Sequence, residues 1–137
     1  MKKSVVTVLL ASLGMLVTGI AIGYLFDFLI PSLGDEYKNA SLYRPWDDPM
    51  MYIFFLQPFV LSGALVWGWN KVKDRFKGST GRKAINVSLI MLILTIIPGM
   101  LMTLSSFKVS VLAILTWTIS GFIQVLVASL IYIRMNK

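Results

Sequence analysis

Four long apolar runs dominate this sequence and limit the folds that are open to it. They cover about residues 4–30, 49–70, 84–104 and 109–133, and three of them contain no charged residue. A helix needs about 20 residues to cross the roughly 30 Å hydrocarbon core of a bilayer. A closed β-barrel would need short alternating segments instead of continuous apolar runs. The sequence therefore predicts a single domain, residues 1–137, folded as an all-α membrane protein with a four-transmembrane-helix antiparallel bundle.

Composition supports this class and excludes several kinds of chemistry. The chain is 57% hydrophobic and 14% charged, which is too apolar for an ordinary soluble domain. It contains no cysteine, so disulfides and thiol redox chemistry are excluded. It also contains no histidine, the commonest general base and transition-metal ligand. We therefore predict no catalytic residue, no cofactor and no metal site, and we expect a non-enzyme.

The charged residues in the connecting segments are sorted by side. Ten of the thirteen Lys and Arg lie with both termini and residues 71–83, and five of the six acids lie in residues 27–48. Counting Asp74 with the ten cations gives +9 on the first side, and three cations against five acids give −2 on the second. Because cytoplasmic flanks collect Lys and Arg, we expect both termini and the loop 71–83 in the cytoplasm, and an outer loop 31–48. The expected location is the cell inner (cytoplasmic) membrane, as a multi-pass protein.

The first apolar run also resembles a secretory signal peptide, since it follows Lys2 and Lys3. A signal core is usually about 7 to 15 apolar residues long, and this run continues to Ile30. We therefore interpret it as an uncleaved span.

Helix ends are marked by residues with local reasons to be there. Pro31 is expected to end the first span, followed by a turn at residues 32–34. Asp48 before Pro49 is typical of an N-cap followed by proline at the first helical position. Ser79 or Thr80 is expected to cap the third span.

Three polar residues fall at a similar depth in three spans. Gln57, Thr95 and Thr118 all lie about 12 to 15 Å from the outer boundary at a rise of about 1.5 Å per residue. Pro58 and Pro98 are expected to kink the same half of the bundle, which would open an outward vestibule. The polar residues could line that vestibule or only bond between helices, and we favour interhelical bonding.

Small residues four positions apart mark expected helix contacts, because close approach drives helix packing in lipid. We expect these contacts to lie mainly within one chain, although a homo-oligomer or a membrane protein partner is the alternative. The pairs are Gly19 with Gly23, Ala64 with Gly68, and Thr116 with Ser120.

Aromatic residues with a polar handle favour the headgroup region, so we interpret those near the span ends as membrane anchors. They are Trp67, Trp69 and Tyr132 on the inner side, and Tyr37, Tyr43, Trp46 and Tyr52 on the outer side.

The outer loop and the end of the first span hold the clustered acids. Carboxylates in such a cluster could bind a divalent cation or act as an acid and base pair on lipid or glycan. We favour a solvated loop in which cations and acids pair. Asp27 is the one ionisable group inside a span, which makes it a functional candidate, although its shallow position lets it reach water. The candidates in this region are Asp27, Asp35, Glu36, Arg44, Asp47 and Asp48.

The inner loop is basic, and its expected partner is the anionic headgroups of membrane lipid on the cytoplasmic side. Nucleic acid is not expected, because the topology explains the positive charge. Residues 78–83 lack the spacing of a phosphate-binding loop. The predicted headgroup contacts are Lys71, Lys73, Arg75, Lys77, Arg82 and Lys83.

Residues 42–49, together with Pro58-Phe59 and residues 67–73, resemble small prokaryotic four-span membrane proteins to which no activity is assigned. The resemblance implies one natural four-span domain and carries no functional residue across.

Three functional hypotheses stay open. The leading hypothesis is a non-enzymatic binding or assembly protein. The alternatives are a small transporter or channel with an outward-facing vestibule, and an enzyme that acts on lipid or glycan at the outer membrane face.

Overall fold

The computed structural model describes residues 2–136, and these are helical over most of their length. Four helical segments are long and apolar enough to cross a membrane, as predicted. They run over Ser4–Leu29, Pro49–Arg75, Thr80–Ser106 and Val111–Met135. The second and third segments extend beyond the predicted ends at residues 70 and 84, because the helices continue into the polar loop between them.

The second and third segments are built from shorter elements joined end to end. Only the first and fourth long segments are single α-helices. In chain order the elements are α1 (Lys2–Leu29), α2 (Pro31–Tyr37), η1 (Pro49–Leu56), α3 (Gln57–Val72), η2 (Lys73–Arg75), α4 (Thr80–Met91), η3 (Leu92–Ile96), α5 (Ile97–Ser106) and α6 (Val111–Met135).

All three predicted helix boundaries are confirmed, and the first span ends at Leu29, just before Pro31. Asp48 caps η1, with Pro49 in the first turn, and Ser79 caps α4 by accepting a hydrogen bond from the Arg82 amide. The turn predicted at residues 32–34 is wrong, because α2 occupies this stretch. Pro31 fits the first helical turn, and the helix buries Leu33, which is 1% exposed. The free energy gained by burying Leu33 outweighs the preference of Ser32 and Gly34 for a turn.

The two prolines inside the apolar segments each begin a stretch of regular α-helix. Pro58 lies in the first turn of α3 and follows the 3-10 helix η1, and Pro98 lies in the first turn of α5 and follows the π-helix η3. Proline has no N–H and its ring clashes with the carbonyl four residues earlier. The change in helical pitch before each proline accommodates that clash.

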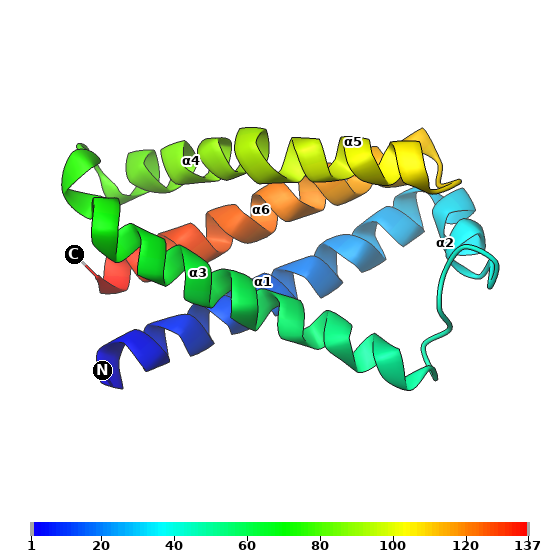
Figure 1. Cartoon of the computed structure of the whole chain (residues 1–137), viewed down its shortest axis with the longest axis horizontal. Coiled ribbons are helices and arrows are strands. Elements are labelled where there is room, and N and C mark those ends of the chain that lie inside the picture. Colours follow the sequence, from blue (N-terminus) through cyan, green and yellow to red (C-terminus); the bar gives the residue numbers. More distant parts are fainter. Residues whose placement is uncertain (1, 137) are drawn as a thin grey trace.

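Helix α6 occupies the middle of the arrangement (Figure 1). It packs on α1 and on α4 with its continuation η3 and α5, whereas α3 packs mainly on α1. Helices α1 and α3 cross each other, so α3 lies apart from α5 toward the acidic end and approaches the start of α4 at the other end of the molecule (Figure 1). Helix α1 begins and α6 ends at one end of the molecule, beside residues 73–79, which we call the basic end. Residues 31–48 lie at the opposite end, which we call the acidic end (Figure 1).

The core lies in the half of the molecule toward the basic end. There α1, α3, α4 and α6 bury a continuous apolar cluster, and hydroxyl side chains fill the close contacts between them. The cluster consists of Ala11, Met15, Leu65, Val66, Trp69, Ala84, Val125, Ala128, Tyr132 and Ile133.

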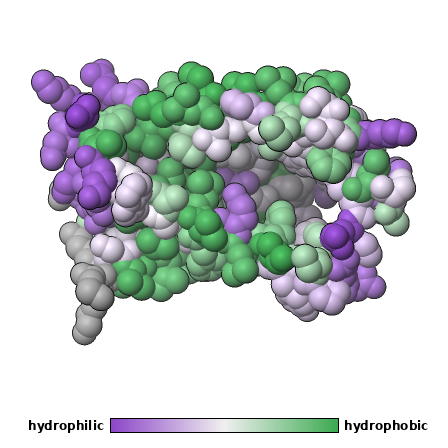
Figure 2. Space-filling view, in the orientation of Figure 1, coloured by the Kyte–Doolittle hydropathy of each residue, from purple (hydrophilic) through white to green (hydrophobic). Residues whose placement is uncertain are grey.

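The half toward the acidic end is more open. No residue of η1, η3 or α5 is buried. In Figure 2 apolar residues cover the middle of the molecule, and hydrophilic residues gather at its two ends. This distribution of polar and apolar residues matches the layers of a bilayer, in which an apolar core lies between two polar headgroup regions.

Candidate functional site

Glu36 connects the acidic loop to the start of α6. Its Oε1 accepts hydrogen bonds from the Ser110 amide at 2.9 Å and from the Tyr43 hydroxyl at 3.1 Å. Ser110 is also the N-cap of α6, since its Oγ accepts from the Ala113 amide at 3.0 Å. A carboxylate at a helix N-terminus is favoured by the helix dipole. Glu36 therefore holds two segments together that lie 74 residues apart in the chain.

An aromatic group adds to this connection. The Trp117 indole N–H donates to the Tyr37 hydroxyl at 2.9 Å, and the two rings stack at 6.3 Å. Tyr43 meets both rings edge-on, at 5.4 Å from Tyr37 and 6.1 Å from Trp117. The predicted anchors Tyr37 and Tyr43 thus contact the fourth span. The sequence interpretation overlooked Trp117, although its position one to two turns into that span places it at the level of the loop.

The titratable groups of this cluster respond to their surroundings. Partial burial raises the pKa of Glu36, but hydrogen bonds from Ser110 and Tyr43 outweigh burial and leave the pKa below its ordinary value. Burial raises the pKa of Tyr37. Burial and the neighbouring Glu36 carboxylate raise the pKa of Tyr43. Both tyrosines therefore stay protonated at neutral pH and keep their donor hydrogens.

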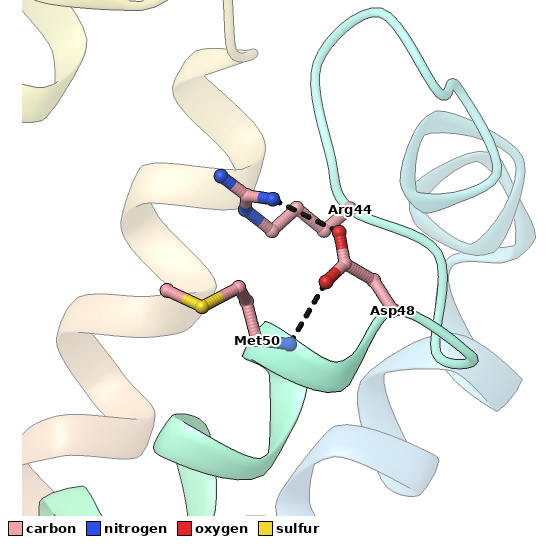
Figure 3. A network of polar contacts seen from close by, with 3 residues as sticks. All are labelled: Arg44, Asp48 and Met50. Atoms are coloured by element: carbon pink, nitrogen blue, oxygen red, sulfur yellow. Dashed lines mark hydrogen bonds and ion pairs between the residues drawn. The ribbon is translucent and has the colours of Figure 1, made fainter.

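The other predicted acids have surroundings different from those of Glu36. Asp48 accepts from the Met50 amide at 2.8 Å and from Arg44 Nη1 at 2.9 Å (Figure 3). These bonds lower the pKa of Asp48. Asp35 pairs with Lys38 at 3.1 Å, and both side chains are exposed.

Asp27 and Asp47 are also exposed. Within residues 2–136, no three acidic side chains come together in a group that could hold a metal ion.

The three polar residues predicted at one depth have different surroundings. Gln57 and Thr95 are exposed, and Thr118 donates to the Ile114 carbonyl of its own helix at 2.7 Å. Intrahelical bonding of this kind satisfies a hydroxyl without a partner helix.

The predicted headgroup residues lie at the basic end. Lys73 and Lys83 are half-buried, and the other four are exposed: Lys71, Arg75, Lys77 and Arg82. The predicted anchors on this side differ among themselves. Trp67 is 69% exposed, whereas Trp69 and Tyr132 belong to the core. The prediction of an anchor role is therefore wrong for Trp69 and Tyr132, because both rings pack against other helices.

Two of the three small-residue pairs contribute to packing inside the chain. A Cβ at Gly19 would meet the Gln124 side chain of α6 at 3.0 Å, and Thr116 is buried. The third pair has a different environment. Ala64 is exposed, and nothing lies within 4 Å of a Cβ placed at Gly68.

The third pair belongs to a face of α3 that points away from the core. Val60, Ala64 and Trp67 follow the helical spacing of three and four residues, and all three are exposed. The opposite face buries Ser62, Leu65, Val66 and Trp69. We call the first set, with Gly68, the small-residue face of α3.

A shallow apolar groove of about 380 Å³ lies beside this face, between α1 and α3. From α3 it is lined by Gly63, Val66, Trp67 and Asn70, and from α1 by Ser4, Val5, Val8 and Leu9. A Cβ at Gly63 would meet nothing within 4 Å. The groove and the small-residue face together are therefore accessible to an approaching helix.

Comparisons with protein families, with curated proteins and with solved structures gave no significant match to this chain.

Proposed function

We propose that this protein is a non-enzymatic multi-pass membrane protein that assembles through α3, with the basic end in the cytoplasm. The partner is a second copy of the chain, which presents the same face of its own α3. The charge difference between the two ends supports this orientation, because Lys and Arg collect on cytoplasmic flanks.

The observation that carries the proposal is the outward direction of Ala64 and Gly68. Helices in lipid associate where small residues let their backbones approach closely. The corresponding residues Gly19 and Thr116 are already covered by contacts within the chain. Ala64 and Gly68 are not covered: Ala64 is exposed, and a Cβ at Gly68 would meet nothing within 4 Å. A two-fold interface brings identical patches together, so one small-residue face on each copy is sufficient.

The groove beside this face gives a second reason. Trp67 forms its border and is exposed, so its ring can pack against the helix of a second copy. Aromatic residues contribute strongly to interfaces because they bury a large area with few rotatable bonds.

The acids of the loop support a structural role over a catalytic one. Glu36 binds the start of α6, Asp48 caps η1, and Asp35 pairs with Lys38. A catalytic acid and base pair would need two carboxyl groups directed at one substrate position. The contacts of these three acids direct them to different parts of the backbone and loop.

Cysteine cross-linking in native membranes tests the proposal, because the chain has no cysteine of its own. In an Ala64→Cys variant, the two cysteines should lie close to the two-fold axis and form a disulfide-linked dimer on mild oxidation. The matched control is Leu94→Cys, an exposed apolar position on η3 and outside the small-residue face of α3, which should remain mostly monomeric.

A second substitution distinguishes the interface from chance collision. Gly68→Ile in the Ala64→Cys background should abolish most of the cross-linking, whereas Gly23→Ile should leave it unchanged. Gly23 is a suitable control because a Cβ there also meets nothing within 4 Å. Equal cross-linking at positions 64 and 94, or loss caused by Gly23→Ile alone, would contradict assembly through α3.

A further inference from the structure

A pocket of about 430 Å³ lies at the basic end, between the end of α3 and the start of α4. Its lining includes Ile133 of α6, Asn136 at the C-cap of that helix, and Gly78. The polar lining comes from Lys73, Asp74, Ser79, Thr80 and Lys83, with Trp69 on the core side. Because Trp69 lies on the buried face of α3, this pocket is separate from the small-residue face.

The buried Trp69 indole is the first observation that points to a ligand. Trp69 is 4% exposed, and its Nε1 has no hydrogen-bond partner among the described residues. A buried donor without a partner is unfavourable, and such groups in native proteins usually have a bound partner. Trp69 lines the pocket, so an acceptor seated there is the natural partner for this N–H.

Positive charge is concentrated around the same indole. Lys83 Nζ lies 6.0 Å from the centre of the Trp69 ring, within the range of a cation–π contact. Lys73 also lines the pocket. The first turn of α4, a helix of 12 residues, contributes backbone N–H groups and the positive end of its dipole. Within this turn, the Ser79 side chain accepts from the Arg82 amide and the Ser79 carbonyl accepts from the Lys83 amide.

Asp74 limits the charge that the pocket can accept. Two lysines and one aspartate give a net charge of about +1 before the helix dipole is included. This balance suits an acceptor with one negative charge better than one with two.

We propose that this pocket binds the phosphodiester group of a glycerophospholipid. The phosphate oxygens accept hydrogen bonds from the Trp69 indole, from Lys83 and from the first turn of α4. The location supports a lipid, because the pocket lies at the ends of the second and third apolar segments, at the level where the headgroups of a bilayer would lie. The acyl chains would extend along the apolar outer surface of these segments. The site extends the predicted headgroup contacts by selecting Lys73 and Lys83 from the six loop cations and by adding Trp69.

Native mass spectrometry of the purified full chain in detergent tests the site, with phosphatidylglycerol as the titrated lipid. Lys83→Gln and Trp69→Phe should each weaken binding by about tenfold, since each removes one hydrogen bond to a charged group. Lys77→Gln is the matched control, because Lys77 is exposed in the same loop and its replacement changes the net charge equally. It should change the affinity by less than about threefold at physiological salt.

Circular dichroism and size-exclusion elution establish that each variant is folded, and Lys83→Gln tests the site if Trp69→Phe unfolds. Equal losses for Lys77→Gln and Lys83→Gln would overturn the proposal, since they indicate diffuse attraction of lipid to the basic end. Unchanged binding in folded Trp69→Phe would overturn it as well.

A titration with inorganic phosphate is the second experiment. If it binds with the same variant pattern and phosphatidylglycerol does not bind, the phosphate site stands but the lipid assignment is wrong. Failure here leaves the Ala64 cross-linking result unaffected, so the two proposals are tested separately.

Discussion

The two halves of the molecule are held together by different means. Toward the basic end, four helices meet in one apolar core with closely packed small residues such as Ala11 and Ala128. Toward the acidic end, η1 and α5 bury nothing, and the loop is joined to α6 by Glu36 and by stacked aromatic rings. Packing toward the basic end depends on how closely the side chains of the four helices fit together. The connection toward the acidic end depends on a few hydrogen bonds and ring contacts.

This difference follows from the residues available in each half. Close helix contacts need small side chains on facing surfaces, and Ser12, Ser62, Ser88 and Ser129 supply them toward the basic end. The hydroxyls do not remain unpaired, since Ser12 and Ser88 bond to carbonyls of their own helices. Around η1 the sequence instead offers a run of large apolar residues, including Phe54 and Phe55, which favour lipid over a close neighbour. Local stability should therefore be high toward the basic end and lower toward the acidic end.

The largest expected effect comes from removing a core ring. Tyr132 is 0% exposed and contacts Trp69, with ring centres 5.9 Å apart. Tyr132→Ala should destabilise the protein by about 3 kcal/mol or more, because a large cavity replaces the ring. The matched control in the other half is Tyr52→Ala, since Tyr52 is 75% exposed, and its cost should stay within about 0.5 kcal/mol. Thermal unfolding in one detergent measures both. Similar costs for the two variants would refute the difference in packing.

An intermediate effect is expected from the connection at the acidic end. Glu36→Gln replaces a charged acceptor by a neutral one, so it should destabilise the protein by about 1 kcal/mol at neutral pH. Because the pKa of Glu36 in the folded protein is lowered, its contribution is present above the ordinary value of 4.5 and is lost as the pH falls through the folded pKa.

The pH dependence separates this charge effect from a packing effect. The difference in melting temperature between the wild type and Glu36→Gln should shrink as the pH falls below 4.5. The difference for Tyr132→Ala should not follow that trend. A Glu36→Gln difference that is constant from neutral pH down to pH values well below 4.5 would contradict the ionised contact with Ser110.

In both halves the sequence predicts local features better than contacts between distant segments. Apolar runs of about 20 residues and the caps at Asp48 and Ser79 depend on neighbours along the chain, so they could be predicted. The contact of Glu36 with Ser110 joins positions 74 residues apart, and no periodicity indicates it. The same reason applies to Trp69, whose position near a span end is typical of an anchor. Its burial depends on how α4 and α6 pack around it, which is a tertiary effect.

The smallest expected effect concerns Asp35, the immediate neighbour of Glu36. Its pair with Lys38 is exposed on both sides, and water and salt screen such pairs almost completely. Asp35→Asn should therefore leave the melting temperature unchanged within error at every pH at which the protein is folded. The substitution removes the same charge from the same loop as Glu36→Gln, so it serves as the control for net charge. If both variants destabilise the protein equally, the loop acids act through their summed charge. The inference that Glu36 specifically connects α2 to α6 would then be wrong. If only Glu36→Gln destabilises, the acidic end depends on one directed contact, as the hydrogen bonds to Ser110 and Tyr43 imply.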